Sequence, residues 1–480
     1  MEQSVRKTKI VCTLGPATSS PEMIEKMIAA GMNVARLNFS HGSYESHANT
    51  YNSIRKAAER HNRHVGILQD LSGPKIRLGE LPREIILETG QEVLLGASGG
   101  GADGKIFLPV GYPYLYEDVQ IENRILLADG LVEFKVVDKR DRTLVCQVTA
   151  GGVLSSHKGV NLPTSNLRIP AFTDKDKEDL EVGLKLGVDF VAMSFVRHED
   201  DVKPVKQRLI ELASKTGRQR PLLIAKIEKP QALERFSQIL SEVDGIMVAR
   251  GDLGVEMPLE QVPVIQKRLI REARRAGKVV ITATQMLRSM IDNPRPTRAE
   301  ANDVANAILD GTDAVMLSEE SAVGSYPVEA VLTLDRVARA TEPDMADWRF
   351  LDEQTSGLLS ETSAAISHAV CLLARDLNPA VIVATTHSGS TARLISLYRP
   401  PVKLMGLSSS PEVCRQLCLS WGVDPVINDN YVEIYEIIQS GVNKACQNGF
   451  ACPGDKVIVT TGFPLGTSGG TNLIKVSVAE

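Results

Sequence analysis

Short runs of apolar and β-branched residues alternate with amphipathic stretches along most of the chain. Eight of these runs have the length and composition of buried parallel strands: KIVCTL (9–14), NVARLNFS (33–40), VGILQDL (65–71), FVAMSF (190–195), LLIAKIE (222–228), GIMVAR (245–250), VVITAT (279–284) and AVMLS (314–318). Helical stretches such as SPEMIEKMIAAG (20–31) and LEQVPVIQKRLIREARRAG (259–277) separate them and end in glycine. The pattern predicts an α/β fold, either a closed (β/α)8 TIM barrel, which we favour, or an open doubly wound sheet.

The alternation is interrupted once and later restarts. Residues 73–169 contain alternating strands punctuated by Gly and Asp, which predicts a small antiparallel β-barrel domain inserted after the third strand. This insertion divides the barrel domain into residues 1–72 and 170–345 and would overhang the carboxyl ends of its strands. Residues 346–480 contain a helix (ETSAAISHAVCLLARDL) and five strand-like runs, which predict a C-terminal α/β domain.

Composition excludes several classes of protein. With 54 basic and 59 acidic residues the net charge is −5, which argues against a broad cationic surface for nucleic acid or anionic lipid. The seven cysteines show no CxxC pair and are predicted to be reduced thiols. No apolar run reaches the roughly 18 residues of a membrane span, and a strand pattern starts too early for a signal peptide. We expect a cytoplasmic protein with no nucleic-acid or membrane partner.

Polar residues occur at the ends of five predicted strands, where the active sites of a (β/α)8 barrel lie. They are Arg36, Asn38, Ser40, Asp70, Lys226, Glu228, Arg250, Asp252 and Thr284. Lys226 and Glu228 are two residues apart in LLIAKIEKP, so they share one face of a strand. The two alone would fit an ordinary ion pair, but five converging strand ends with charges of both signs predict a functional site.

The residue types at this rim favour phosphoryl chemistry. Glu228 and Asp252 offer carboxylate oxygens to Mg2+, with water and substrate oxygens completing its coordination. Arg36 and Lys226 place cations beside the metal, as phosphoryl transfer requires, because charge spreads over the phosphoryl oxygens. Glycines on both sides of Asp252 would let backbone N–H groups approach an anionic ligand, although Gly-Asp-x-Gly is most often a turn.

Several longer motifs occur together in one order: VARLNFSHG, GPKIR, GVNLP, AKIE, VARGDLGVE, ITATQML, RPTRAEANDVANAILDG and GTSGGTNLIKV. Together they resemble the pyruvate kinase family over nearly the whole chain. The resemblance implies phosphoryl transfer from phosphoenolpyruvate to ADP, giving pyruvate and ATP at the last step of glycolysis. It also implies Mg2+ as cofactor, with Mn2+ as a substitute, a homotetramer, and an inserted domain that closes as a lid.

The resemblance assigns roles to matching positions. Arg36 would bind the substrate phosphate, Lys226 would stabilise the phosphoryl group, and Glu228 and Asp252 would ligate Mg2+. The substrate carboxylate would be held by the catalytic Thr284 together with the backbone of Gly251 and Asp252. The positions that match nucleotide-binding residues are Asn38, His41, Arg77 and Lys158.

One departure from the family pattern concerns K+. Many relatives read Asp-Thr-Lys-Gly-Pro-Glu and need K+, whereas this chain reads DLSGPK and ends the motif with Lys75. The monovalent-cation site would comprise Asn38, Ser40, Asp70 and Leu71. A Lys75 ammonium near this site would replace K+, so we predict activity without K+; the alternative is a loop lysine that points to water.

The loop in VIVATTHSGSTARL resembles the family's regulatory sugar-phosphate site. Its candidate effector-binding residues are Thr386, Ser388, Gly389, Ser390 and Thr391. A strand followed by Ser, Thr and Gly suits a phosphate cradle, but an ordinary helix N-cap explains these residues equally well. Two other functions remain open: a Mg2+-dependent lyase or aldolase barrel acting on pyruvate or phosphoenolpyruvate, and a sugar-phosphate sensor without activity.

Overall fold

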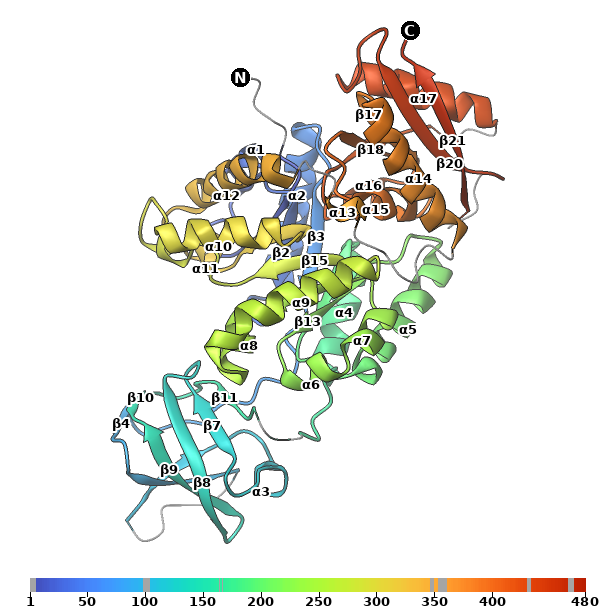
Figure 1. The fold of residues 1–480 in the computed structure, drawn as a ribbon. Helices are drawn as coiled ribbons and strands as arrows, with labels where there is room; N and C mark the ends of the chain where they lie inside the picture. The colour runs from blue at the N-terminus through green and yellow to red at the C-terminus, as the bar shows by residue number, and fades with distance from the viewer. Residues whose placement is uncertain are drawn as a thin grey trace.

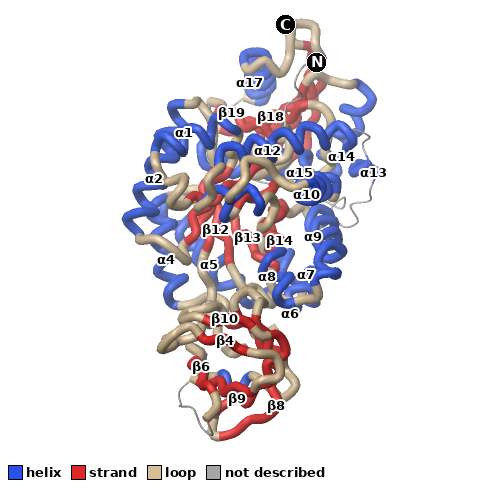
Figure 2. The backbone as a smooth tube through the Cα atoms, turned by 90° about the vertical axis from the view of Figure 1, so that its left-hand side faces the viewer, coloured by secondary structure: helices blue, strands red, loops and turns tan. Residues whose placement is uncertain are grey.

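The computed structural model describes residues 6–97, 104–163, 165, 167–345, 349–352, 361–429, 433–464 and 470–480. A barrel forms the centre of the molecule, with a small β domain at one end and an α/β domain at the other (Figure 1). The view in Figure 2, turned by 90°, shows the same sequence of three layers from top to bottom.

Eight parallel strands form the closed barrel in the order β1-β16-β15-β14-β13-β12-β3-β2. Their bounds are β1 (Lys9–Leu14), β2 (Val34–Asn38), β3 (Gly66–Asp70), β12 (Phe190–Met193), β13 (Leu222–Ile227), β14 (Gly245–Ala249), β15 (Val279–Ala283) and β16 (Ala314–Leu317). The eight predicted strands are confirmed, and closure of the sheet excludes the open doubly wound alternative.

The two faces of each barrel strand are both apolar because one faces the barrel interior and the other faces the helices. Val34, Leu68 and Ile224 belong to the interior cluster, whereas Ile10 and Ile67 belong to the cluster between strands and helices. Cys418 and Leu419 from the C-terminal domain join the interior cluster. The C-terminal domain therefore seals the end of the barrel opposite the strand ends that carry the predicted site.

Helices surround the barrel. They are α1 (Pro21–Ala30), α2 (Tyr44–Arg60), α4 (Asp174–Leu186), α5 (Glu199–Thr216), α6 (Pro230–Glu234), α7 (Phe236–Glu242), α8 (Arg250–Glu256), α9 (Val262–Arg275), α10 (Arg298–Leu309), α11 (Glu319–Ala322) and α12 (Pro327–Thr341), with 3-10 turns η1 (Leu259–Gln261), η2 (Arg288–Ile291) and η3 (Glu342–Met345). The helix predicted over 259–277 divides into η1 and α9, because Pro263 in the first turn of α9 has no N–H to continue the helix.

The inserted domain, which we call the lid, has eight strands and one short helix among its described residues. They are β4 (Ile85–Leu87), β5 (Glu92–Gly96), β6 (Ile106–Pro109), α3 (Leu115–Asp118), β7 (Arg124–Leu127), β8 (Val132–Arg140), β9 (Thr143–Ala150), β10 (Gly152–Leu154) and β11 (Val160–Asn161). A curled sheet of order β11-β7-β8-β9-β5-β6 and the pair β10-β4 enclose one apolar core. The predicted antiparallel pairing holds for the other strand pairs of this domain, but β5 and β6 pair in parallel.

The C-terminal domain has the predicted five-stranded α/β architecture, with strand order β19-β18-β17-β20-β21 and only β21 antiparallel to its neighbour. Its strands are β17 (Val381–Thr385), β18 (Lys403–Ser408), β19 (Val423–Ile427), β20 (Lys456–Gly462) and β21 (Thr471–Val478). Its helices are α13 (Arg349–Asp352), α14 (Thr362–Leu377), α15 (Ser390–Ser396), α16 (Pro411–Leu417) and α17 (Ile434–Gln447). Motif residues 466–469 lie outside the described residues.

All seven cysteines are free thiols, as predicted. Among the helices that the structure describes, none is both long and apolar enough to cross a membrane.

Candidate active site

Lys226, at the end of β13, lies at the centre of the polar rim. Its Nζ is 2.9 Å from Glu228 Oε1 and 3.4 Å from Asp70 Oδ1, and it donates a hydrogen bond to Ser194 Oγ at 2.8 Å. The Ser194 hydroxyl in turn donates to the carbonyl of Leu71 at 2.7 Å. The Lys226 side chain is 11% exposed, so its ammonium is fixed by protein groups and still reachable from the barrel mouth.

Arg36 is held beside Lys226 by the carboxylate of Asp70, which contacts both side chains. Arg36 Nε donates to Asp70 Oδ2 at 2.7 Å, and Arg36 Nη1 donates to Thr13 Oγ1 at 2.8 Å. Asp70 is only 1% exposed and therefore depends on these two cations for its stability as an anion. Asp70 thus holds two cations, Arg36 from β2 and Lys226 from β13, next to each other at the barrel mouth.

The protonation states follow from burial and pairing. Burial alone would raise the pKa of Asp70, but Lys226 and Arg36 hold it below its ordinary value. Burial alone would lower the pKa of Lys226, but Asp70 and Glu228 raise it above its ordinary value. Lys226 is therefore a permanent cation at neutral pH, suited to charge stabilisation rather than to proton abstraction.

Glu228 and Asp252 form a pair of carboxylates that fits a divalent cation. Glu228 Oε2 accepts a hydrogen bond from the Phe195 N–H at 2.7 Å, and burial together with the Asp252 charge raises the pKa of Glu228. A cation between the two carboxylates would offset their repulsion. Within the described residues no group of three or more His, Cys, Asp or Glu side chains could hold a metal. A cation held by these two carboxylates would keep further coordination positions for water or substrate oxygens.

Asp252 lies in a helix, so Gly-Asp-x-Gly does not form here the turn that is its commonest structure. Helix α8 begins at Arg250, and the Gly251 N–H donates to Thr284 Oγ1 at 2.7 Å. Thr284 and Gln285 have positive φ angles of 67° and 55°, a strained backbone for residues with side chains. The three predicted carboxylate-binding groups are thus brought together.

Arg250 has a supporting position. Its Nη1 lies 2.6 Å and 2.7 Å from the two Asp303 carboxylate oxygens, and its Nη2 donates to the Thr284 carbonyl at 2.7 Å. These contacts attach the start of α8 to α10 and to the strained end of β15.

The four residues of the predicted monovalent-cation site lie at the ends of β2 and β3. Asn38 and Asp70 are direct partners in the strand register, and the Ser40 N–H donates to Asn38 Oδ1 at 3.1 Å. Lys75 is exposed in the loop that follows. Burial, followed by the charges of Lys75 and two arginines, lowers the pKa of His41, so Lys75 lies close enough to His41 to act on it.

Arg77 and Lys158 lie on neighbouring segments at the base of the lid. Arg77 pairs with Gly159 in an antiparallel bridge, and the Leu78 N–H donates to the Lys158 carbonyl at 2.8 Å. The charge of Arg77 also contributes to the lowered pKa of His41, so the base of the lid lies near the loop that follows β2.

The predicted effector loop joins β17 to α15. Gly389 has φ 83°, and its N–H donates to Thr386 Oγ1 at 2.9 Å, while Ser388 Oγ donates to Ser390 Oγ at 3.2 Å. Thr391 is buried and its hydroxyl contacts that of Thr471. The loop therefore presents Ser388 and Ser390, and Thr391 belongs to the interior of the domain.

Sequence reasoning missed Ser194 and Thr13 as site residues. Ser194 orients Lys226, and Thr13 orients Arg36. Both lie at the ends of predicted barrel strands, so extending the strand-end rule to the first and fourth strands would have found them.

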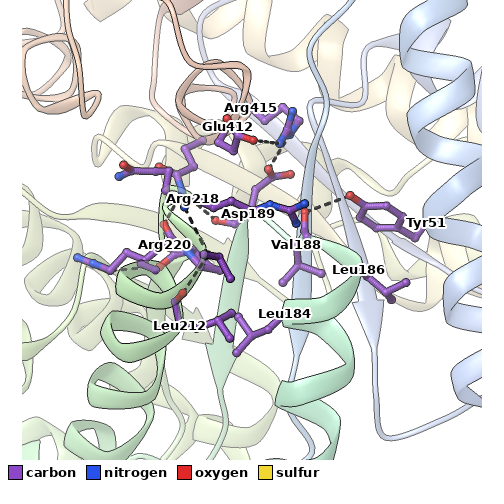
Figure 3. A pocket seen from close by; sticks show the side chains of 16 residues that line it. Tyr51, Leu184, Leu186, Val188, Asp189, Leu212, Arg218, Arg220, Glu412 and Arg415 are labelled. Carbon is purple, nitrogen blue, oxygen red and sulfur yellow. Dashed lines mark hydrogen bonds and ion pairs between the residues drawn. The ribbon is translucent and has the colours of Figure 1, made fainter.

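A cavity of about 280 Å³ lies at the amino-terminal ends of β12 and β13, away from the polar rim and against α16 (Figure 3). Asp189 accepts hydrogen bonds there from Arg55 Nη2 at 2.6 Å and from Arg415 Nε at 2.7 Å. None of the predicted site residues lines this cavity. The contact between Arg415 and Asp189 attaches α16 of the C-terminal domain to the barrel at this point.

The chain is similar to proteins of one family in sequence and in structure. The family model described as pyruvate kinase, barrel domain, matches residues 5–331, and that described as pyruvate kinase, alpha/beta domain, matches residues 364–477. A pyruvate kinase from Clostridium acetobutylicum is 42% identical over 477 residues, covering 99% of this chain and all (100%) of the relative. A pyruvate kinase from Staphylococcus aureus (strain USA300) is 46% identical over 475 residues, covering 98% of this chain and 80% of the relative. The crystal structure of a pyruvate kinase from Cryptosporidium parvum superposes with a TM-score of 0.93 at 37% identity, covering 99% of this chain and 96% of that one.

Proposed function

Because this chain belongs to the pyruvate kinase family, we propose that its barrel mouth moves a phosphoryl group from phosphoenolpyruvate to ADP through Arg36, Lys226 and Thr284. The observation that carries these roles is the buried cluster in which Lys226 contacts Asp70 and Glu228 while Arg36 contacts Asp70. Two cations converge there beside Glu228, which with Asp252 is proposed to hold Mg2+.

In the proposed reaction, a β-phosphate oxygen of ADP forms a bond to the phosphorus while the bond from phosphorus to the enol oxygen breaks. The enolate then takes up a proton and becomes pyruvate. Arg36 binds the phosphate before transfer, and Lys226 stabilises the charge on the phosphoryl oxygens during transfer. Mg2+ held by Glu228 and Asp252 would neutralise part of the same charge when bound.

The substrate carboxylate is proposed to bind at the start of α8. The backbone N–H groups of Gly251 and Asp252 and the Thr284 hydroxyl lie together there, and the Gly251 N–H already meets the hydroxyl at 2.7 Å. Donors of this kind suit an anionic oxygen, and their attachment to a helix and a barrel strand fixes the substrate relative to Lys226.

The nucleotide is proposed to bind between barrel and lid, in contact with Asn38, His41, Arg77 and Lys158. The position of Arg77 and Lys158 on adjacent lid segments supports this role. Closing the lid would bring their charges to the phosphates of ADP and exclude water, which otherwise competes for the phosphoryl group.

Monovalent-cation independence rests on Lys75. Its effect on His41 supports a position near the end of β2, where Asn38 and Ser40 lie beside Asp70. The proposal is that the ammonium supplies the charge that K+ supplies in relatives.

Regulation is proposed to act through the loop at Ser388 and Ser390, with a sugar phosphate as effector and a homotetramer as the assembly. The hydroxyls of this loop and the positive φ of Gly389 support a phosphate-binding conformation. The test is activation by a panel of sugar phosphates in the parent and in Ser390→Glu, whose carboxylate would repel the phosphate. An unchanged response in the variant would contradict the role of this loop.

The overall proposal is tested by measuring pyruvate formation from phosphoenolpyruvate with and without ADP. Strict dependence on ADP and Mg2+, with one ATP per pyruvate, is the expected result. A lyase would form pyruvate without ADP, and a sensor would form none.

A further inference from the structure

Glu256 is the residue at which the lid, helix α8 and the end of β13 meet. It is the last residue of α8, and its side chain is 1% exposed. Its Oε1 accepts hydrogen bonds from Asn161 Nδ2 at 2.9 Å and from Lys229 Nζ at 2.6 Å. Asn161 ends β11 of the lid, and Lys229 directly follows Glu228. A single oxygen atom therefore joins three segments that are distant in sequence.

The chemistry of this junction makes it sensitive to the position of the lid. A buried carboxylate is stable only when it is paired and hydrogen-bonded. Glu256 Oε2 has no hydrogen-bond partner in the part of the chain that the structure describes, so Oε1 carries these contacts. Withdrawal of Asn161 would leave Lys229 as the remaining partner and would open the junction to water.

A second contact brings the lid against the same helix. A Cβ added at Gly130, in a turn of the lid, would lie 3.8 Å from Val255 Cγ1 of α8. Asp129 and Asn161 of the lid also line a cavity of about 100 Å³ together with Lys229 and Asp252. The lid therefore touches α8 next to one of the two carboxylates proposed to hold Mg2+.

We propose that Asn161 and Glu256 form the contact that fixes the base of the lid against α8 and are positioning residues for phosphoryl transfer. Helix α8 carries Asp252 in its first turn and Glu256 at its end, and Glu256 accepts a hydrogen bond from Lys229, the residue after Glu228. Contact with Asn161 thus couples the position of the lid to the relative position of Glu228 and Asp252. This inference rests on the proposed roles of those two carboxylates.

The test uses variants that break and then rebuild the contact. Asn161→Ala removes the hydrogen-bond donor of the lid. We expect kcat to fall about tenfold, which corresponds to a rise of ~1.4 kcal/mol in the activation free energy. The KM for phosphoenolpyruvate should stay nearly unchanged. Asn161→Asp places a second carboxylate against Glu256 and should lower kcat further. The double variant Asn161→Asp, Glu256→Gln restores one carboxylate and one amide facing Lys229, and it should be several-fold faster than Asn161→Asp alone, roughly what one recovered hydrogen bond provides.

Two measurements separate positioning from a loss of folding. Glu260→Gln, an exposed acid on η1, is the matched control and should keep the parental kcat. Hydrogen exchange of α8 amides, measured without metal or substrates, should accelerate in Asn161→Ala while exchange in α17 stays unchanged. Unfolding temperatures of all variants check that each is folded.

The proposal would be overturned by parental kcat and parental α8 exchange in Asn161→Ala, or by a double variant no faster than Asn161→Asp alone. Failure of the proposed function would look different. The parental protein itself would then form no ADP-dependent pyruvate, while the exchange experiment would still report on the contact.

Discussion

Lys226 and Glu228 lie two residues apart at the end of β13, and the ammonium of one is 2.9 Å from the carboxylate of the other. Both side chains are nearly buried, at 11% and 2% exposed. The pair therefore differs from exposed ion pairs, which contribute little to the free energy of unfolding. Asp70 adds a second carboxylate at 3.4 Å from the same ammonium. The arrangement keeps Lys226 charged and leaves Glu228 close enough to Asp252 for the charge of Asp252 to raise the pKa of Glu228.

Replacement of Lys226 by methionine keeps an unbranched side chain, one atom shorter, and removes its charge. We expect kcat for ADP-dependent pyruvate formation to fall by about 10²- to 10³-fold, because one electrostatic group at the transition state is lost. The buried Asp70 and Glu228 also lose a shared partner, so the free energy of unfolding should drop by roughly 3–5 kcal/mol. Steady-state kinetics and thermal unfolding measure the two effects.

Lys177→Met is the matched control, since Lys177 is an exposed lysine on α4 whose partner is the exposed Asp174. It should retain the parental rate and stability. Equal rates for Lys226→Met and the parent protein would refute the role of Lys226.

Asp252→Asn should weaken binding of the divalent cation. The amide removes one of two negative charges, so the Mn2+ dissociation constant should rise at least roughly tenfold. The same change removes the repulsion that, with burial, raises the pKa of Glu228, so that pKa should move down toward its ordinary value. Calorimetric titration of the substrate-free protein with Mn2+ measures the change in the Mn2+ dissociation constant without relying on turnover.

Asp129→Asn serves as its comparison, because Asp129 lines the same cavity from the lid but is exposed. Similar losses of Mn2+ affinity in both variants would indicate a general loss of negative charge rather than a ligand at Asp252.

Much of the barrel and of its rim follows from the sequence because parallel strands place their carboxyl ends together. Lys226, Asp70 and Arg36 were predicted to converge from this rule alone, and their contacts are present in the structure. The rule is geometric and needs no knowledge of side-chain packing.

What the sequence did not predict depends on contacts between distant segments. Glycines around Asp252 indicated a turn, yet the chain continues as α8, whose end is fixed by the buried Glu256–Lys229 pair. Local helix propensity does not predict such contacts between distant segments. The parallel pairing of β5 with β6 was missed for a related reason, since alternation of apolar residues reports burial and not strand direction.

Lys75 should make the enzyme indifferent to K+. We expect equal rates in Na+, K+ and a bulky organic cation for the parent protein, and strong activation by K+ in Lys75→Glu, which resembles the K+-requiring motif. The variant also removes one of the charges that lower the pKa of His41, so that pKa should rise, as NMR titration would show. K+ activation of the parent protein itself would contradict the prediction.

Arg415 should matter for stability rather than for chemistry. It reaches from α16 to Asp189, which is 2% exposed and precedes β12. Arg415→Ala leaves Asp189 with Arg55 as its charged partner, so the free energy of unfolding should fall by about 1.5–3 kcal/mol, the range for a hydrogen bond to a charged group.

Arg218→Ala is the matched control for this prediction, because Arg218 lines the same 280 Å³ cavity as Arg415 but is exposed. Its loss should change the free energy of unfolding by no more than about 0.5 kcal/mol. The rate at 25 °C should stay near the parental value in Arg415→Ala. The reason is that β12 is paired on both sides within the closed barrel, which keeps Ser194 beside Lys226 even when the far end of the strand loses one contact. A large loss of kcat with unchanged stability would show instead that the C-terminal domain acts on the active site through this strand.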